Sequence, residues 1–125
     1  MIHLRTVEEI DAIGRAGAII AALIAELPSR TVAGASTHDI NRFCDDFIVS
    51  HEGATPAFKG LYGFPGAVCT SVNEEVVHGI PNTESVLKDG DIVSVDGGVK
   101  LEGWCADSAW TFGVGEVDET TQDLM

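Results

Sequence analysis

The order in which the hydrophobic periodicity changes along the chain constrains its fold most. From Ile10 to Leu27, apolar residues recur at three- and four-residue steps, which is the period of one helical face. The segment from Thr6 to Glu9 has the form of a capping box, so the helix is expected to begin there. Pro28 is expected to end it. These signals predict an amphipathic helix of about twenty residues.

A second helix is predicted directly after the first. Ser36 or Thr37 can cap its N-terminus, and Gly53 suits a left-handed cap after its C-terminus. Its inner face is expected to carry the apolar residues Ile40, Phe43, Cys44, Phe47 and Ile48.

From Pro56 onward, glycine, proline and β-branched residues dominate the sequence. Strands are predicted over 67–72, 75–77, 92–99 and 104–114, and residues 116–125 resemble the beginning of a third helix. Two helices followed by antiparallel strands indicate an α+β fold in which the helices cover one face of the sheet.

The charge distribution narrows the classes of partner. The chain of 125 residues has a net charge of −13, and residues 61–125 hold twelve acids but only two bases. This balance argues against a nucleic-acid backbone or an anionic membrane as the main partner. The acids of the second half either face solvent or bind cations, and solvation is the commoner case.

The cysteines and the N-terminus indicate a compartment. Cys44, Cys69 and Cys105 are odd in number and form no C-x-x-C pair, which favours a reducing cytoplasm over a disulfide framework or a zinc knuckle. No signal-peptide core is present, and the apolar run 16–25 is far shorter than a membrane span.

Two aspartates on consecutive predicted strands are the strongest candidates for chemistry. If residues 100–103 form the turn, Asp96 lies directly opposite Asp107 on one sheet face. Two ionised carboxylates at that distance need a shared proton, a basic neighbour or a metal ion, and a divalent cation is the natural solution. The alternative is a bulge at Gly97–Gly98 that breaks this register and separates the two side chains.

Two carboxylates cannot complete a metal site alone, and few other ligands are at hand. His78 lies in a loop rich in glycine and proline, where a lone histidine is usually a surface residue. Cys105 precedes Asp107 by two residues and so shares its strand face, although an inert thiol is the commoner role there.

The same segments resemble type I methionine aminopeptidases of peptidase family M24 over the whole 125 residues. The resemblance is carried by Gly63–Pro65, Cys69–Pro81, Asp89–Asp96 and Ala106–Phe112, together with Arg5–Ile10 and Arg15–Gly17 at the N-terminal side.

This resemblance implies that residues 1–125 form the N-terminal half of a methionine aminopeptidase-like catalytic domain with the pita-bread fold. It implies removal of the N-terminal methionine from nascent proteins when the second residue is small. It also implies two divalent metal ions, such as cobalt, manganese, iron or zinc, bound by Asp96 and Asp107. His78 aligns with the catalytic histidine that contacts the substrate, and Phe64 and Cys69 align with walls of the methionine pocket.

The resemblance also implies ligands beyond these positions. The family takes a histidine and two glutamates from its second half, so a catalytically incomplete fragment or a peptide-binding module is the alternative function. A symmetric homodimer is a further way to complete the fold. The sequence departs from the family pattern at Leu61, Gly97 and Cys105. Prolidase-like relatives are a less favoured alternative, because they carry a large additional N-terminal domain.

Overall fold

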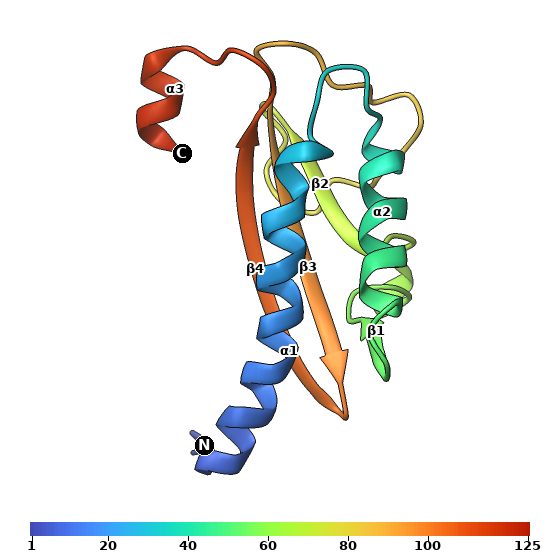
Figure 1. The fold of residues 1–125 in the computed structure, drawn as a ribbon, viewed down its shortest axis with the longest axis vertical. Coiled ribbons are helices and arrows are strands. Elements are labelled where there is room, and N and C mark those ends of the chain that lie inside the picture. Colours follow the sequence, from blue (N-terminus) through green and yellow to red (C-terminus); the bar gives the residue numbers. More distant parts are fainter.

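The computed structural model describes all 125 residues and has the expected α+β architecture. Two helices, α1 (Val7–Glu26) and α2 (Thr37–Val49), cover one face of an antiparallel sheet (Figure 1). The strands are β1 (Ala54–Pro56), β2 (Val68–Val72), β3 (Ile92–Leu101) and β4 (Trp104–Gly113). Short 3₁₀ turns, η1 (Leu27–Ser29) and η2 (Leu61–Gly63), and a terminal helix α3 (Glu119–Leu124) complete the fold.

Both long helices begin where the capping signals predict. Thr6 caps α1 with a capping box to Glu9, and Ser36 caps α2 with a capping box to Asp39. These boxes satisfy backbone N–H groups that have no partner within the first helical turn.

The buried face of α1 differs from the predicted stripe. Ile20 and Leu27 are buried as expected, but Ile10 is 57% exposed. The rest of the buried face consists of Ala12, Ala16, Ile19 and Leu23. The side of α1 with small residues faces the sheet, because small side chains let the helix approach the strands closely. A Cβ on Gly17 would lie 3.8 Å from the Cβ of Ala106. The inner face predicted for α2 is confirmed, with Ile40, Cys44 and Ile48 fully buried.

Strand β3 is the centre of the sheet. Along one edge it pairs with β4 over its full length, and its other edge pairs first with β2 and then with β1. Strands β1 and β2 therefore lie end to end, and residues 57–67 leave the sheet between them. The short strand β1 was not predicted, and the strand predicted over 75–77 is wrong: these residues form a loop in which Val76 is 85% exposed.

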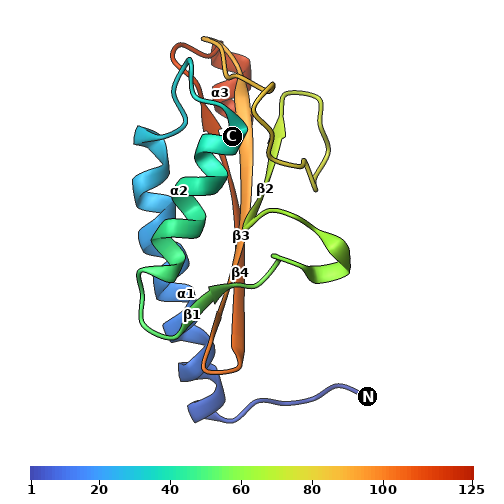
Figure 2. The ribbon, with the colours of Figure 1, turned by 90° about the vertical axis from the view of Figure 1, so that its right-hand side faces the viewer.

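The sheet has one covered and one open face. A cluster of sixteen buried hydrophobic residues fills the space between the helices and the covered face, with Val93, Val95 and Val99 of β3 at its centre. Residues 57–65 and the loop that carries His78 extend from the opposite, open face (Figure 2). The chain then returns to the helices before β3: Leu87 belongs to the buried core, and its N–H donates to the carbonyl of Ala35. None of the three α-helices combines the length and the hydrophobicity that a membrane-spanning segment needs.

The turn between β3 and β4 corrects the predicted register. Only Glu102 and Gly103 form the turn, with φ values of 51° and 86°, as in the tight turns that suit the twist of a hairpin. Asp96 therefore opposes Ala109, and Asp107 opposes Gly98. The register is continuous through Gly97 and Gly98, so the alternative of a bulge is also wrong.

Candidate functional site

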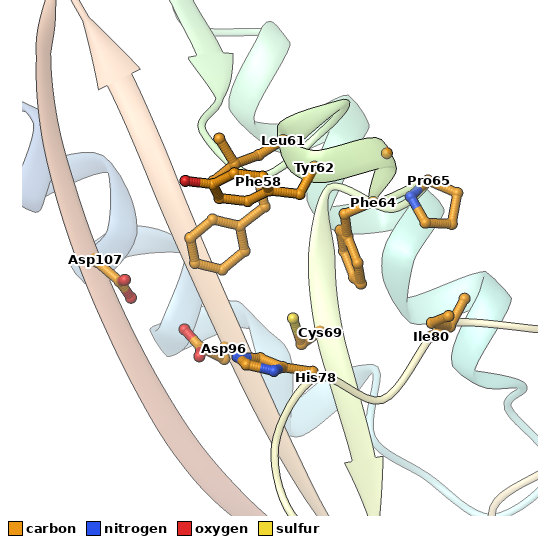
Figure 3. A pocket seen from close by; sticks show the side chains of 11 residues that line it. Phe58, Leu61, Tyr62, Phe64, Pro65, Cys69, His78, Ile80, Asp96 and Asp107 are labelled. Atoms are coloured by element: carbon orange, nitrogen blue, oxygen red, sulfur yellow. The ribbon is translucent and has the colours of Figure 1, made fainter.

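A pocket of about 610 Å³ lies on the open face of the sheet (Figure 3). One wall belongs to the segment between β1 and β2 and consists of Phe58, Leu61, Tyr62, Gly63, Phe64 and Pro65. The floor comes from the strands, and the segment after β2 closes the remaining side, with Cys69, His78, Ile80, Asp96 and Asp107. The pocket thus combines an apolar wall with a small group of ionisable side chains, which is typical of small-molecule and peptide sites.

The corrected register still brings the two aspartates together. Because side chains two residues apart point to the same face of a strand, Asp96 lies on the face of Gly98, and Asp107 lies opposite Gly98. The two carboxylates are therefore diagonal neighbours across β3 and β4, and both line the pocket.

The environment of Asp96 disfavours its ionised form. Burial raises the pKa of Asp96 to about 6, and the neighbouring Asp107 contributes to the rise, whereas His78 opposes it. One side-chain oxygen of Asp96, Oδ1, is buried and has no hydrogen-bond partner. No lysine or arginine lines the pocket.

These observations fit a divalent cation. A bound cation would supply the partner that the buried Oδ1 of Asp96 lacks, and it would relieve the repulsion between the two carboxylates. The chain has no group of three or more histidine, cysteine, aspartate or glutamate side chains arranged to hold a metal ion. Asp96 and Asp107 are therefore suited to provide part of a coordination shell.

His78 enters the pocket from a tightly held loop. Val77 and His78 have φ values of 46° and 53°, in the left-handed region that is uncommon outside glycine. Gly79 lies against the outer edge of β2: its carbonyl accepts from Thr70 N at 3.0 Å, and its N–H donates to Ser71 Oγ at 3.1 Å. The imidazole points toward Asp96 and Cys69 (Figure 3).

Cys69 and Phe64, which the family resemblance implies as pocket walls, also line this pocket. Cys69 pairs with Asp96 in the β2–β3 register, and its thiol pKa is raised by burial and by the charges of Asp96 and Asp107. Phe64 lies beside Cys69, and Leu61 lines the same pocket (Figure 3). The structure thus places His78, Phe64, Cys69, Asp96 and Asp107 in one pocket.

Cys105 does not join this group. It shares a strand face with Asp107, but it opposes Lys100, is exposed and does not line the pocket. A thiolate ligand from this position is not supported.

Sequence reasoning missed Phe58, Tyr62 and Ile80, which also line the pocket. The glycine at position 98, inside a predicted strand, could have indicated that a side chain such as Phe58 packs on the strand there. A Cβ on Gly98 would lie 2.8 Å from the Phe58 ring, so the aromatic side chain packs directly on the strand backbone. Glycine inside a strand often marks such a close approach.

Comparisons with known proteins match both the fold and the pocket segments. A model of metallopeptidase family M24 matches residues 11–125. The methionine aminopeptidase of Clostridium perfringens is 46% identical over 125 residues, which are 100% of this chain and 49% of that protein. The crystal structure of methionine aminopeptidase from Thermotoga maritima has a TM-score of 0.94 at 41% identity, covering 99% of this chain and 49% of that chain.

A prolidase from Pyrococcus furiosus has a TM-score of 0.81 at 19% identity, over 96% of this chain and 34% of that chain, which shows a shared fold alone. The chain spans about half the length of the curated relatives it matches. These similarities confirm the expected fold class, half of a pita-bread fold with two long helices on an antiparallel sheet.

Proposed function

The chain belongs to metallopeptidase family M24, and on that premise we propose that it takes part in metal-dependent removal of the N-terminal methionine from nascent proteins whose second residue is small. The observation that carries this proposal is the meeting of Asp96 and Asp107 with an apolar, sulfur-containing wall in one pocket. Related methionine aminopeptidases are about twice as long. The activity, substrates and partners of the whole protein therefore all belong to the proposal.

N-terminal methionyl peptides are the proposed substrates. A methionine side chain is unbranched and polarizable, and its thioether makes favourable contacts with aromatic rings. Phe64 and Cys69 offer an aromatic ring and a second sulfur next to each other in the pocket. We assign these two residues to binding of the methionine side chain.

Asp96 and Asp107 are the proposed ligands of two divalent metal ions, with cobalt, manganese, iron and zinc as candidates. When bound, such ions lower the pKa of a coordinated water and polarise the peptide carbonyl. Asp96 is suited to this role because its buried Oδ1 has no other partner. The family resemblance takes a further histidine and two glutamates from a second half, so these two aspartates alone are expected to bind metal weakly.

His78 is the proposed catalytic residue. From its position beside Asp96, the imidazole can donate a hydrogen bond to the oxygen of the scissile carbonyl, where negative charge develops. The left-handed backbone at Val77 and His78 belongs to the loop that carries this ring. A strained, well-supported loop is a common means of presenting a catalytic side chain.

The alternative is a peptide-binding module that recognises the methionyl terminus without cleaving it. The observation in its favour is that the chain has no metal-binding group of three or more ligands. A homodimer would bring two further aspartates to a shared site. We propose that the chain is active as such a homodimer, without a different partner protein. All three cysteines are free, which is consistent with the proposed cytoplasmic location.

Calorimetry with the chelator-treated chain tests the metal proposal. Manganese binding should weaken by at least about tenfold in Asp96→Asn and Asp107→Asn, because even the loss of an outer-shell partner costs that much. Asp123→Asn, an exposed acid on α3, is the matched control and should bind manganese as the wild type does. Equal binding by all four proteins would overturn the assignment of the ligands.

Incubation with Met-Ala-Ser peptides and manganese separates the two functions. Release of free methionine, with a dimer seen by light scattering, supports the aminopeptidase. Peptide binding without release supports the binding module. The absence of both binding and release, in a folded protein, excludes both functions for this chain.

A further inference from the structure

Helix α2 supports both walls of the pocket from the opposite side of β2. Thr37 and Asn41 lie four residues apart, on the same face of the helix. Asn41 contacts the segment that carries Phe64, and Thr37 contacts the segment that carries His78 and Ile80. Neither helix residue lines the pocket itself.

Asn41 holds the point where the pocket wall joins β2. Its Oδ1 accepts hydrogen bonds from the backbone N–H groups of Ala67 at 2.7 Å and of Val68 at 3.4 Å. Ala67 and Val68 are fully buried, so water cannot replace this acceptor. A Cβ on Gly66 would lie 3.0 Å from the same oxygen, which shows how closely the chain passes Asn41. Cys69 follows directly.

Thr37 holds the opposite wall. Its Oγ1 donates to the carbonyl of Asn82 and accepts from the N–H of Asn82, both at 3.0 Å. The Asn82 side chain then donates to the carbonyl of Ile80 at 3.1 Å. The backbone N–H of Thr37 also donates to Ser85 at 2.9 Å. This network fixes the segment that follows His78.

We infer that Asn41 is a positioning residue, which sets the Phe64–Cys69 wall at the distance from the His78 wall that a bound side chain requires. The inference rests on the proposed function for the identity of that side chain. Only the acceptor oxygen of Asn41 is used in the contact. An aspartate at this position should therefore preserve the arrangement, whereas an alanine should release the wall.

The thiols of the chain provide a test that needs no catalytic activity. In a Cys105→Ser background, two thiols remain: Cys69 at the pocket, and Cys44, which is 0% exposed in the core. Maleimide labelling followed by peptide mass spectrometry gives a rate for each. Cys69 reports opening of the pocket wall, and Cys44 reports opening of the whole core, so their ratio separates positioning from general stability.

Asn41→Ala should raise the Cys69 rate by about tenfold or more relative to Cys44, the effect of losing one to two buried hydrogen bonds. Asn41→Asp should restore the wild-type ratio. If Asn41→Ala does not fold, Asn41→Ser takes its place and should give a smaller rise. A parallel rise at both thiols, an unchanged ratio, or an Asn41→Asp ratio like that of Asn41→Ala would each overturn the inference.

Protection of Cys69 by a methionyl peptide distinguishes this inference from the proposed function. In the wild type, saturating peptide should slow Cys69 labelling, and in Asn41→Ala this protection should need about tenfold more peptide. If the peptide gives no protection while the labelling ratio still depends on Asn41, the proposed function fails and the support of the pocket wall by Asn41 remains. If protection is identical in wild type and Asn41→Ala, the positioning role fails although the function stands.

Discussion

Asp107 lies opposite Gly98, and not opposite Asp96, so the two pocket carboxylates are diagonal neighbours on one face of β3 and β4. A diagonal pair is farther apart than a directly opposed pair, which leaves room for a ligand between the carboxylates. Gly98 has no side chain, and the ring of Phe58 occupies the space that a Cβ there would need.

The raised pKa of Asp96 predicts a pH-dependent stability in the metal-free chain. Its folded-state pKa of about 6 lies above the value near 3.9 expected in the unfolded chain. The folded state therefore binds this proton more tightly, and stability falls as pH rises from about 4 through about 6. Above about pH 6, the loss of stability caused by the ionised Asp96 no longer changes with pH.

The variant Asp96→Asn removes the destabilisation that the ionised carboxylate causes at high pH. After a discount for solvent screening of a half-buried group, we expect the variant to be more stable than the wild type by about 1 kcal/mol at pH 8 and by almost nothing near pH 4. Urea unfolding with a chelator present measures both values. Asp123→Asn should show no such pH-dependent difference, and a constant difference for Asp96→Asn would contradict the prediction.

Thr70→Val is expected to stabilise the chain. Thr70 is 2% exposed on the covered face of β2, and its Oγ1 is buried without a hydrogen-bond partner. Valine has nearly the same shape and removes the unpaired hydroxyl, so the free energy of unfolding should rise by about 1 kcal/mol. Thermal and urea unfolding check this. Ser71→Val is the contrasting variant: it should be destabilising, because Ser71 Oγ accepts from Gly79.

Gly79→Ala should disturb the His78 loop. A Cβ at residue 79 would lie 2.0 Å from the carbonyl oxygen of Thr70, a backbone atom that cannot move aside cheaply. We expect a loss of about 1–3 kcal/mol, as for other overpacked sites, and weaker binding of methionyl peptides. Circular dichroism and calorimetry measure the two effects.

Gly14→Ala is the matched control for that change. Gly14 lies within α1, and a Cβ there would have no neighbour within 4 Å. The same substitution should therefore stabilise the chain by about 0.5–1 kcal/mol, the usual gain in a helix interior. Equal effects at both glycines would show that the close packing of Gly79 on β2 does not matter.

Local signals predicted the helices and the strands β2 to β4, because capping boxes and alternating apolar runs act over a few residues. They also pointed to Asp96 and Asp107, whereas Phe64, Cys69 and His78 were implied only by the family resemblance, and Phe58, Tyr62 and Ile80 were missed. These signals failed where tertiary contacts determine the local conformation or the strand register. Residues 75–77 have strand-like composition, yet the turns that place His78 and Gly79 against β2 leave Val76 exposed. The register of β3 and β4 depended on the length of the turn, and both residues of that turn have positive φ.

The pairing of Phe58 with Gly98 gives the sharpest test of the pocket's shape. Gly98→Ala places a Cβ 2.8 Å from the Phe58 ring and 3.0 Å from the Cβ of Ala57, so the ring must leave its position. We expect the single variant to lose about 1–3 kcal/mol of stability and to bind methionyl peptides more weakly.

Adding Phe58→Leu to Gly98→Ala should recover much of the loss, because a smaller side chain no longer meets the new methyl group. A double-mutant cycle should then give a coupling energy of about 0.5–3 kcal/mol, the range for residues in direct contact. Pairing Gly98→Ala with Phe47→Leu on α2 provides the control, because Phe47 packs against the buried core on the covered face and should show no coupling. Additive effects of Phe58→Leu and Gly98→Ala would mean that Phe58 does not rest on the strand, and that the space beside Asp96 and Asp107 is shaped by other residues.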